Sequence, residues 1–220
     1  STDKVAAHYG VIGAIGSERL RRFIGFMILS SIGTIIVALS LMTTDAWTAA
    51  LYYLVHSTII AAAFYLLSGW ITSQRGQFKD HFKNAPVMKQ NTLVSICFFI
   101  IALMMAGLPP FSGFFGKVFV LQASQASPYQ LTIIITVLIV SLLSIIAFTR
   151  VGFVLFWRST APELDVKEKA FEEYANLPSH PPARNDKTIY LMLSGLVLYV
   201  VFAHPIMQYL EKTSAQLQNA

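Results

Sequence analysis

Residues 107–117 read GLPPFSGFFGK, and this short stretch decides how the chain around it must fold. It lies inside a longer apolar region, residues 91–126. The two prolines have no backbone N–H to donate and clash with the preceding turn of a helix. Because lipid cannot satisfy the carbonyl groups that such a break frees, an interrupted membrane helix is stable only inside a protein bundle or beside water. We therefore predict a discontinuous helix broken at 107–110, with a hinge at Gly107, Pro109, Pro110 and Gly113.

The composition of the whole chain indicates a membrane protein. Of its 220 residues 55% are hydrophobic and only 12% are charged, and the mean hydropathy is +0.59. A soluble domain carries about 25% charged residues. The net charge of +5 does not indicate nucleic-acid binding, because the basic residues stand between apolar stretches and not along one polar face. Cys97, the single cysteine, lies within an apolar run, so disulfides play no part in this chain.

Five stretches are apolar and long enough to cross a bilayer. A helix needs roughly 20 apolar residues to cross a hydrocarbon core of about 30 Å. A helical tail over Val5–Ile15 comes before them, so we expect the chain to be the C-terminal part of a longer protein. The predicted fold of residues 1–220 is a single all-α membrane domain, a bundle of five transmembrane helices over about 23–42, 47–71, 91–126, 131–157 and 188–210.

The basic residues of the loops favour counting 91–126 as one broken crossing. Counted so, twelve Lys and Arg residues fall on one side of the membrane and only Lys212 on the other. Cytoplasmic loops carry such an excess of positive charge. Two crossings in the same region would scramble this pattern. We therefore expect a cytoplasmic loop over 158–187, with an amphipathic surface helix over Glu163–Ala175, and a C-terminus outside the cytoplasm.

Lys117 is the most informative residue of the chain. It lies about 7–9 residues from the outer end of its span, or roughly 10–14 Å at the rise of an α-helix. A lysine at that depth costs at least ~2.5–3.5 kcal/mol on insertion scales, so it should face a hydrated interior. A buried amine of this kind is a candidate for proton exchange. The alternative is a lysine whose side chain extends to the outer surface.

His56 is predicted to lie at a similar depth, because it is about ten residues, roughly 15 Å, from the outer end of its span. A histidine titrates in the physiological range and can pass a proton through either ring nitrogen. The alternative is a neutral histidine that only bonds a neighbouring helix, but the matching depth of Lys117 favours a shared proton pathway. The possible secondary members of this pathway are Tyr53, Ser57, Thr58, Ser112 and Arg150.

For the other polar groups in the spans, a structural role in helix packing is the favoured interpretation. Arg150 can reach the cytoplasmic interface through its long side chain, and a structural role is slightly favoured for it. Small hydroxyl groups usually join helices, which is the interpretation we prefer for the five at Ser30, Ser31, Thr34, Ser141 and Ser144.

Several kinds of site are not indicated by the sequence. All eleven acidic residues fall in loops or termini, so a Na⁺ site built around a carboxylate must take it from elsewhere. The histidines have no metal-ligand spacing. Without a phosphate loop, a nucleophile triad or a cysteine cluster, we expect no enzyme activity, no cofactor and no metal site.

The break and its surroundings resemble a known family. Residues 107–117 look like the broken-helix signature of the antiporter-like subunits of Mrp-type Na⁺/H⁺ antiporters and of respiratory complex I. The stretch Tyr52–Thr58 resembles the histidine helix before that break, and Glu18–Thr34 resembles the helix before it. The ending from His204 is similar to the tail of the D-type subunits of Mrp antiporters.

The resemblance implies a membrane subunit of a multisubunit monovalent cation (Na⁺)/H⁺ antiporter, in the bacterial cytoplasmic membrane and in contact with other membrane subunits. Such subunits contain two inverted five-helix repeats, each with a discontinuous helix. Their lateral proton path would here include Lys117 and His56. The chain departs from the family in two ways. Ile60 stands where complex I relatives often carry a lysine, and the family's glutamate–lysine pair would precede residue 1.

Two other functions stay open. One is a proton-pumping membrane subunit of a redox complex, either NADH:quinone oxidoreductase or a membrane hydrogenase. The other is a purely structural membrane subunit, in which Lys117 pairs with a carboxylate of a neighbouring subunit.

Overall fold

The computed structural model describes residues 2–75, 78–82, 88, 90–157 and 184–218. Within these ranges the regular structure is helical, apart from one isolated bridge between Arg19 and His81. The elements are α1 (Thr2–Ile15), α2 (Leu20–Leu39), α3 (Thr44–Gln74), α4 (Asn91–Ala106), α5 (Ser112–Ala123), α6 (Gln130–Gly152), the π-helical turn η2 (Phe153–Trp157), α8 (Arg184–Val201) and α9 (Ala203–Gln218).

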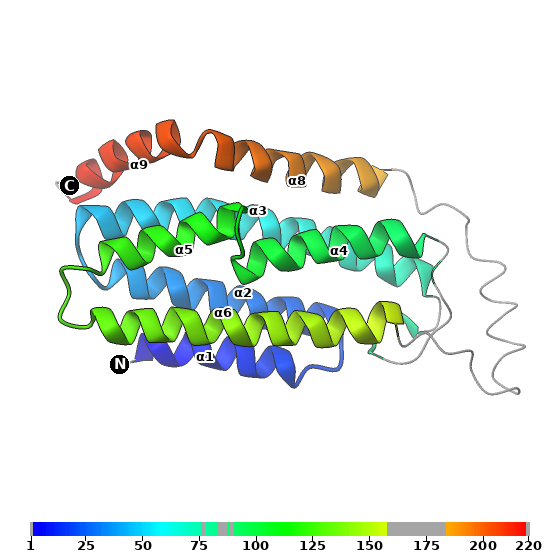
Figure 1. The fold of residues 1–220 in the computed structure, drawn as a ribbon. Helices are drawn as coiled ribbons and strands as arrows, with labels where there is room; N and C mark the ends of the chain where they lie inside the picture. Colours follow the sequence, from blue (N-terminus) through cyan, green and yellow to red (C-terminus); the bar gives the residue numbers. More distant parts are fainter. Residues whose placement is uncertain (1, 76–77, 83–87, 89, 158–183, 219–220) are drawn as a thin grey trace, which may run out of the picture.

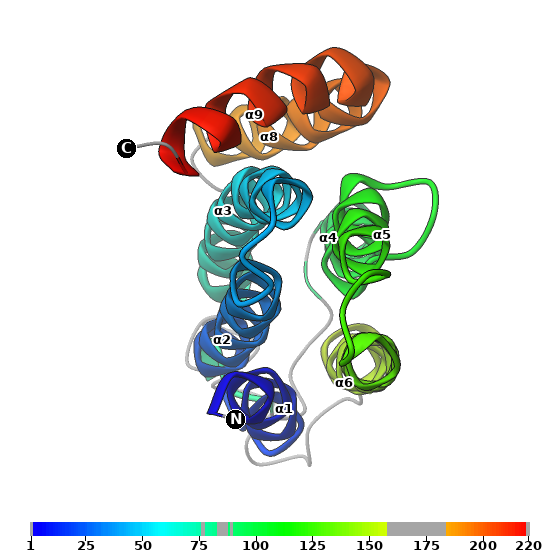
Figure 2. The same cartoon turned by 90° about the vertical axis from the view of Figure 1, so that its left-hand side faces the viewer.

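The helices form a bundle along one long axis (Figure 1). Viewed along that axis, α1, α2 and α3 make one row, and α4, α5 and α6 make a second (Figure 2). The helices α8 and α9 lie across the end of the first row, where both pack on α3. The predicted all-α membrane bundle is confirmed.

Three described helices are long and apolar enough to cross a membrane alone: α2, α3 and α6 with its η2 extension. The helices α8 and α9 add a fourth crossing if the bent pair is counted as one span. The shorter helices α4 and α5 follow one another from one end of the bundle to the other (Figure 1). Counted as one interrupted crossing, they bring the described bundle to the five spans predicted.

The predicted discontinuity lies between α4 and α5. Gly107 ends α4 with a left-handed backbone (φ +79°), a conformation that suits glycine because it has no Cβ. The amides of Gly107 and Leu108 both donate to the carbonyl of Leu103, at 3.1 Å each, and so satisfy a carbonyl at the helix end. A cis peptide bond joins Pro109 to Pro110, and α5 begins at Ser112. The helix is therefore interrupted where the prolines predicted it.

The last predicted span differs from the structure. Residues 188–210 were expected to form one continuous helix, but α8 and α9 meet at an 80° bend around Phe202. Pro205 has no N–H to donate back to α8, whereas a proline is well tolerated in the first turn of a new helix. The amide of Ile206 donates instead to the carbonyl of Phe202, within the first turn of α9 (3.1 Å).

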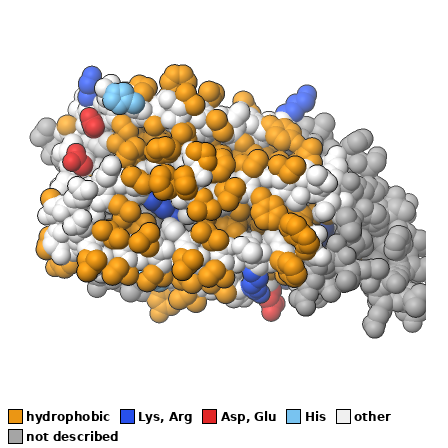
Figure 3. Space-filling model, in the orientation of Figure 1, with side chains coloured by type: hydrophobic (Ala, Val, Ile, Leu, Met, Phe, Trp, Pro, Cys, Tyr) orange, Lys and Arg blue, Asp and Glu red, His pale blue; other side chains and the backbone are white. Residues whose placement is uncertain are grey.

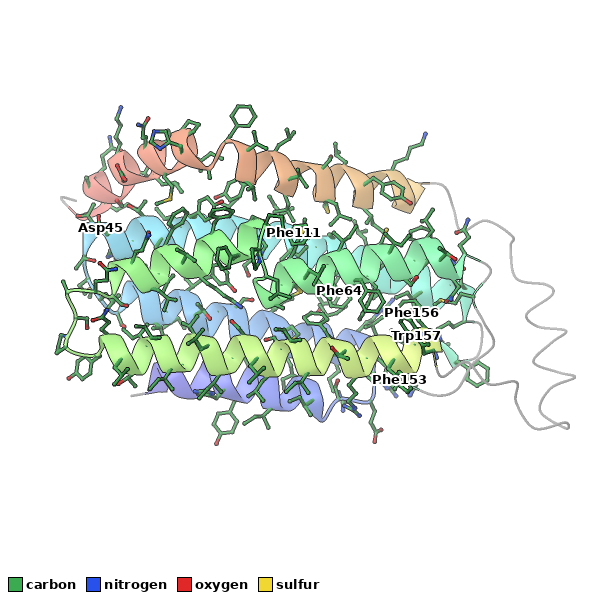
Figure 4. All side chains as sticks on the ribbon, viewed as in Figure 1. Asp45, Phe64, Phe111, Phe153, Phe156 and Trp157 are labelled. Atoms are coloured by element: carbon green, nitrogen blue, oxygen red, sulfur yellow. The ribbon has the colours of Figure 1, made fainter. Side chains whose placement is uncertain are left out.

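An aromatic cluster fills the core of one half of the bundle. The ring of Phe148 in α6 lies 5.1 Å from that of Phe23, 5.8 Å from Phe64 and 6.1 Å from Phe98, measured between centroids. Phe64 lies among the helices, and Phe156 lies toward the same end as Trp157 (Figure 4). These contacts join α2, α3, α4 and α6, with edge-to-face and tilted geometries that aromatic pairs favour.

Charge is distributed unevenly along the bundle. Hydrophobic side chains cover the middle of the face in Figure 3, and most of the charged side chains in view lie near its ends. Arg19, Arg75 and Lys79 belong to one end, where Leu20 N donates to Asp80 O (2.8 Å) and Arg75 donates to the carbonyl of His81 (2.6 Å). Most of the predicted loop 158–187, including its surface helix, lies outside the described residues. Its assignment to the cytoplasm stays a prediction.

Candidate functional site at the helix break

Lys117 is buried, although it belongs to a helix of only twelve residues. Its side chain is 6% exposed and turns back from α5 toward the break. The Nζ atom donates to the carbonyl oxygen of Ala106 at 2.7 Å and to the Oγ of Ser141 at 2.9 Å. Since Ala106 is the last residue of α4, the amine lies at the negative end of that helix dipole. The alternative of a lysine extended to the outer surface does not fit this position.

His56 contacts the second half of the broken helix. It is 1% exposed, and its Nδ1 shares a hydrogen bond of 2.8 Å with the Oγ of Ser112, the first residue of α5. Its Nε2 faces Gly113 in the first turn of α5, where an added Cβ would lie 2.9 Å from that nitrogen. The imidazole therefore joins α3 to the start of the second half-helix.

Gly113 and Gly107 make these contacts possible. A Cβ added to Gly113 would lie 2.0 Å from the carbonyl oxygen of Met104 and 2.9 Å from Nε2 of His56. A Cβ on Gly107 would lie 2.8 Å from Cδ of Lys117. At Gly113 the obstacle is a backbone carbonyl, and at Gly107 the positive φ strains any residue with a side chain, so both positions suit glycine. The two glycines predicted at the hinge let the histidine and the lysine approach the backbone.

The secondary residues predicted around His56 divide into two groups. Tyr53 is buried and stacks on the His56 ring, with the two centroids 5.8 Å apart, so the structure brings it to the histidine. Thr58 is exposed, and its hydroxyl donates to the carbonyl of Leu54 in its own helix (2.8 Å). Thr58 is therefore not brought to the break.

Ser57 is buried in α3 beside His56. Because consecutive residues of an α-helix point about 100° apart, its side chain leaves the helix in a different direction from the imidazole. The structure therefore does not bring the Ser57 hydroxyl together with the ring.

Arg150 lies apart from the break. Its guanidinium donates to the carbonyl oxygen of Ile15, the last residue of α1. A cation at the C-terminus of a helix stabilises the carbonyl groups that have no partner there. This position fits the structural role that was slightly favoured for Arg150.

Ser141 is the residue that the sequence did not single out for the site. It was assigned to packing together with Ser144, but its hydroxyl is a direct partner of Lys117. Nothing local to α6 distinguishes the two serines. What distinguishes Ser141 from Ser144 is the rotation of α6 relative to α5, which depends on how the two helices pack.

The amine and the imidazole share the break without bonding each other directly. Among the described contacts, the hydrogen bonds of this site run from His56 to Ser112 and from Lys117 to Ala106 and Ser141. Phe111, at the start of α5, marks the position of the break in Figure 4.

The fold and this site together define a class of protein: multi-span membrane proteins with a discontinuous helix and ionisable side chains buried at the break. The chain belongs to one family of this class, the transmembrane family of NADH:quinone oxidoreductase and Mrp antiporter subunits (Proton_antipo_M), whose profile matches residues 4–146.

Curated relatives agree with this family. The chain is 26% identical over 214 residues to the D-type subunit of a Na⁺/H⁺ antiporter of Bacillus subtilis (strain 168), covering 96% of this chain and 40% of that protein. It is also 26% identical over 240 residues to the D-type subunit of a probable K⁺/H⁺ antiporter of Rhizobium meliloti (strain 1021), covering 95% and 41%. The resemblance to the D-type subunits is confirmed, and the chain spans about 40% of the length of these relatives.

Solved structures share the fold. An Mrp complex from Dietzia sp. DQ12-45-1b matches with a TM-score of 0.73 and 21% identity, over 98% of this chain and 46% of that one. Respiratory complex I from Thermus thermophilus with bound NADH matches with a TM-score of 0.70 and 20% identity, over 98% and 43%. An archaeal membrane-bound sulfane sulfur reductase matches with a TM-score of 0.79 and 17% identity, over 97% and 40%.

Proposed function

We propose that the chain is part of a membrane subunit of a multisubunit monovalent-cation/proton antiporter, in which it supplies part of the proton pathway midway across the bilayer. The observation that carries the proposal is the buried amine of Lys117, bonded to the end of α4 and to α6 at the break of the discontinuous helix. The names of the relatives, Na⁺/H⁺ and K⁺/H⁺ antiporter subunits of bacteria, support a role in the bacterial cytoplasmic membrane with other membrane subunits as partners.

The contacts support proton exchange at Lys117. As an ammonium group, Nζ donates to the carbonyl of Ala106 and to Ser141, and it keeps a third N–H for a further acceptor. When the proton leaves, Nζ becomes an acceptor, and the attraction between the cation and the end of α4 is lost. The charge of one side chain therefore alters a contact that holds the two half-helices together.

His56 is the proposed proton partner of Lys117. Its ring is bonded to Ser112 through Nδ1, and a hydroxyl can donate one proton while it accepts another. Water in the break would complete the transfer between imidazole and amine, because no direct bond joins them in the described contacts. Tyr53, which stacks on the His56 ring, is the proposed next member of this route.

Replacement of Lys117 tests the proposal. In the full-length protein within its assembled complex, Lys117→Ala should abolish antiport without preventing assembly, because the methyl group cannot carry a proton. Antiport is measured as the cation-dependent pH change in everted membrane vesicles, and assembly by co-purification of the other subunits. Lys212→Ala is the matched control, since Lys212 is exposed near the C-terminus. Antiport retained in the Lys117→Ala complex would contradict the proposal.

Lys117→Arg distinguishes proton transfer from a structural ion pair. Arginine keeps the positive charge but does not deprotonate in proteins. A structural pair with a carboxylate of another subunit should tolerate this change better than a proton carrier does. We expect Lys117→Arg to lose antiport as Lys117→Ala does.

The second candidate function is that of a proton-pumping subunit in a redox complex. The family description, which includes NADH:quinone oxidoreductase, supports it. Purification of the native complex separates the two functions. Flavin and iron–sulfur proteins in the complex would favour the redox pump, and membrane subunits alone would favour the antiporter.

A further inference from the structure

We propose that Ser141 of α6 is a positioning residue that holds the Lys117 amine in both of its protonation states. This inference rests on the proposed function, in which that amine gains and loses a proton. It adds α6 to the elements that form the site.

The bonding of Ser141 differs from that of three other hydroxyls of α6. Thr136, Ser144 and Thr149 each donate to a carbonyl four residues earlier in the same helix, at 2.7, 2.7 and 2.8 Å. This is the usual way in which a hydroxyl is satisfied within a helix. Ser141 is instead the acceptor for Nζ of Lys117, at 2.9 Å from a different helix.

The two oxygen partners of Lys117 have different chemistry. The carbonyl of Ala106 can only accept a hydrogen bond, so it stabilises the amine only through an N–H. A hydroxyl can accept and donate. Ser141 can therefore accept from the ammonium form and, after the proton leaves, donate its own O–H to the lone pair on Nζ.

Ser141 also lies where the buried amine meets the outer face of α6. The serine is half-buried, whereas Leu138 and Leu142 on either side of it are 58% and 59% exposed. Lys117 is 6% exposed and reaches this point from α5. Since the amine is too deep to rely on bulk water, a fixed hydroxyl partner holds Nζ in one position while its charge changes.

Removal of the hydroxyl should slow transport. A hydrogen bond to a charged group is among the strong ones, so Ser141→Ala in the full-length, assembled complex should lower the antiport rate about tenfold or more. It should also change the pH profile of the rate, because the ammonium form loses a stronger, charge-assisted hydrogen bond than the neutral amine does. Ser144→Ala is the matched control, with the same substitution on the same helix, and it should keep the wild-type rate and profile.

Two variants of nearly equal shape separate hydrogen bonding from packing. Ser141→Thr keeps the hydroxyl and Ser141→Val replaces it by a methyl group. We expect Ser141→Thr to restore the wild-type pH profile and most of the rate, and Ser141→Val to behave like Ser141→Ala. If Ser141→Ala does not assemble, the comparison of Thr with Val still decides the question.

The inference fails if Ser141→Ala and Ser141→Val both keep the wild-type rate and pH profile while Lys117→Ala is inactive. That result would leave the proposed function intact. Antiport retained in Lys117→Ala would instead overturn the proposed function itself, whatever the serine variants do. Equal loss in Ser141→Thr and Ser141→Val would assign Ser141 to packing and would also overturn the inference.

Discussion

At the scale of single residues, the site depends on how closely His56 and Lys117 approach the backbone of the broken helix. An imidazole and an amine packed this closely against the backbone of a helix break need neighbours without side chains. Gly113 meets this need for His56, and Gly107 meets it for Lys117 while it also takes a backbone conformation that suits glycine. The chemistry of the two ionisable residues is therefore inseparable from the glycines beside them.

Gly113→Ala should damage the site although it adds only one methyl group. Its Cβ would lie 2.0 Å from the carbonyl oxygen of Met104, so either α5 or the imidazole of His56 must move. We expect antiport to fall at least about tenfold, because a misplacement near 1 Å at a reacting group can cost a hundredfold in rate.

Gly69→Ala is the control for this substitution. Gly69 also lies in a membrane helix, α3, but nothing lies within 4 Å of a Cβ built there. It should keep wild-type antiport in the same vesicle assay. Equal activity of the two variants would show that the break can move to accept a side chain, against the prediction.

At the scale of elements, the bent pair of α8 and α9 is held against α3 at two places. On α8, the Tyr199 hydroxyl donates to the carbonyl oxygen of Tyr52 (3.2 Å), and the two rings stack with centroids 4.6 Å apart. On α9, Ser214 shares a buried hydrogen bond of 2.8 Å with Thr48 of α3. These contacts keep the amphipathic second helix on the bundle after the 80° bend.

Ser214→Leu should loosen α9 from α3. The Ser214 side chain is fully buried against Thr48, so a leucine has no room there and removes the hydrogen bond. Overpacking of this kind costs about 1–3 kcal/mol. We expect a fall of several degrees in the thermal unfolding midpoint of the purified complex.

Gln216→Leu provides the comparison for that measurement. Gln216 is exposed on the same helix, so the same new side chain should leave the midpoint within error of the wild type. If Ser214→Leu and Gln216→Leu unfold at the same temperature, the contact between α9 and α3 contributes less than the structure indicates.

At the scale of the whole molecule, the helix directions place the described basic residues at opposite ends in unequal numbers. Arg19, Arg21 and Arg22 precede or begin α2, at the end of the bundle where Arg75 and Lys79 also lie. Lys212 lies in α9 near the C-terminus, at the other end, which is also the end of Asp45 and of Lys4 at the start of α1 (Figures 1 and 4). Which end faces the cytoplasm stays a prediction.

Cysteine labelling can test which end faces the cytoplasm. Cys97 is buried in α4 and should not react with a maleimide. In a full-length complex whose other accessible cysteines are replaced, a cysteine added at the surface should therefore give the labelling signal. In intact cells a membrane-impermeant maleimide should label Lys212→Cys and not Arg22→Cys, and everted vesicles should show the reverse. Labelling of Arg22→Cys in intact cells would place the basic end outside and contradict the prediction.

The sequence by itself determined the features that depend on local chemistry. Pro109 and Pro110 lack N–H groups in any surroundings, so the helix must break near them, and the surplus of apolar residues requires a membrane bundle. The same stretch identified the family. The depth of Lys117 in its span favoured a buried amine over one extended to the outer surface, because lipid gives a lysine no partner.

Only the tertiary structure decided which side chains meet. Ser141 and Ser144 are three residues apart in one apolar helix. Only the rotation of α6 against α5 determines that Ser141, and not Ser144, bonds to Lys117. Rotation of α3 likewise turns Thr58 away from the break and His56 into it. Such rotations follow from the packing of whole helix faces, which no single stretch of sequence encodes. The bend at Phe202 shows the same limit, because hydropathy measures how apolar a segment is and not whether it is straight.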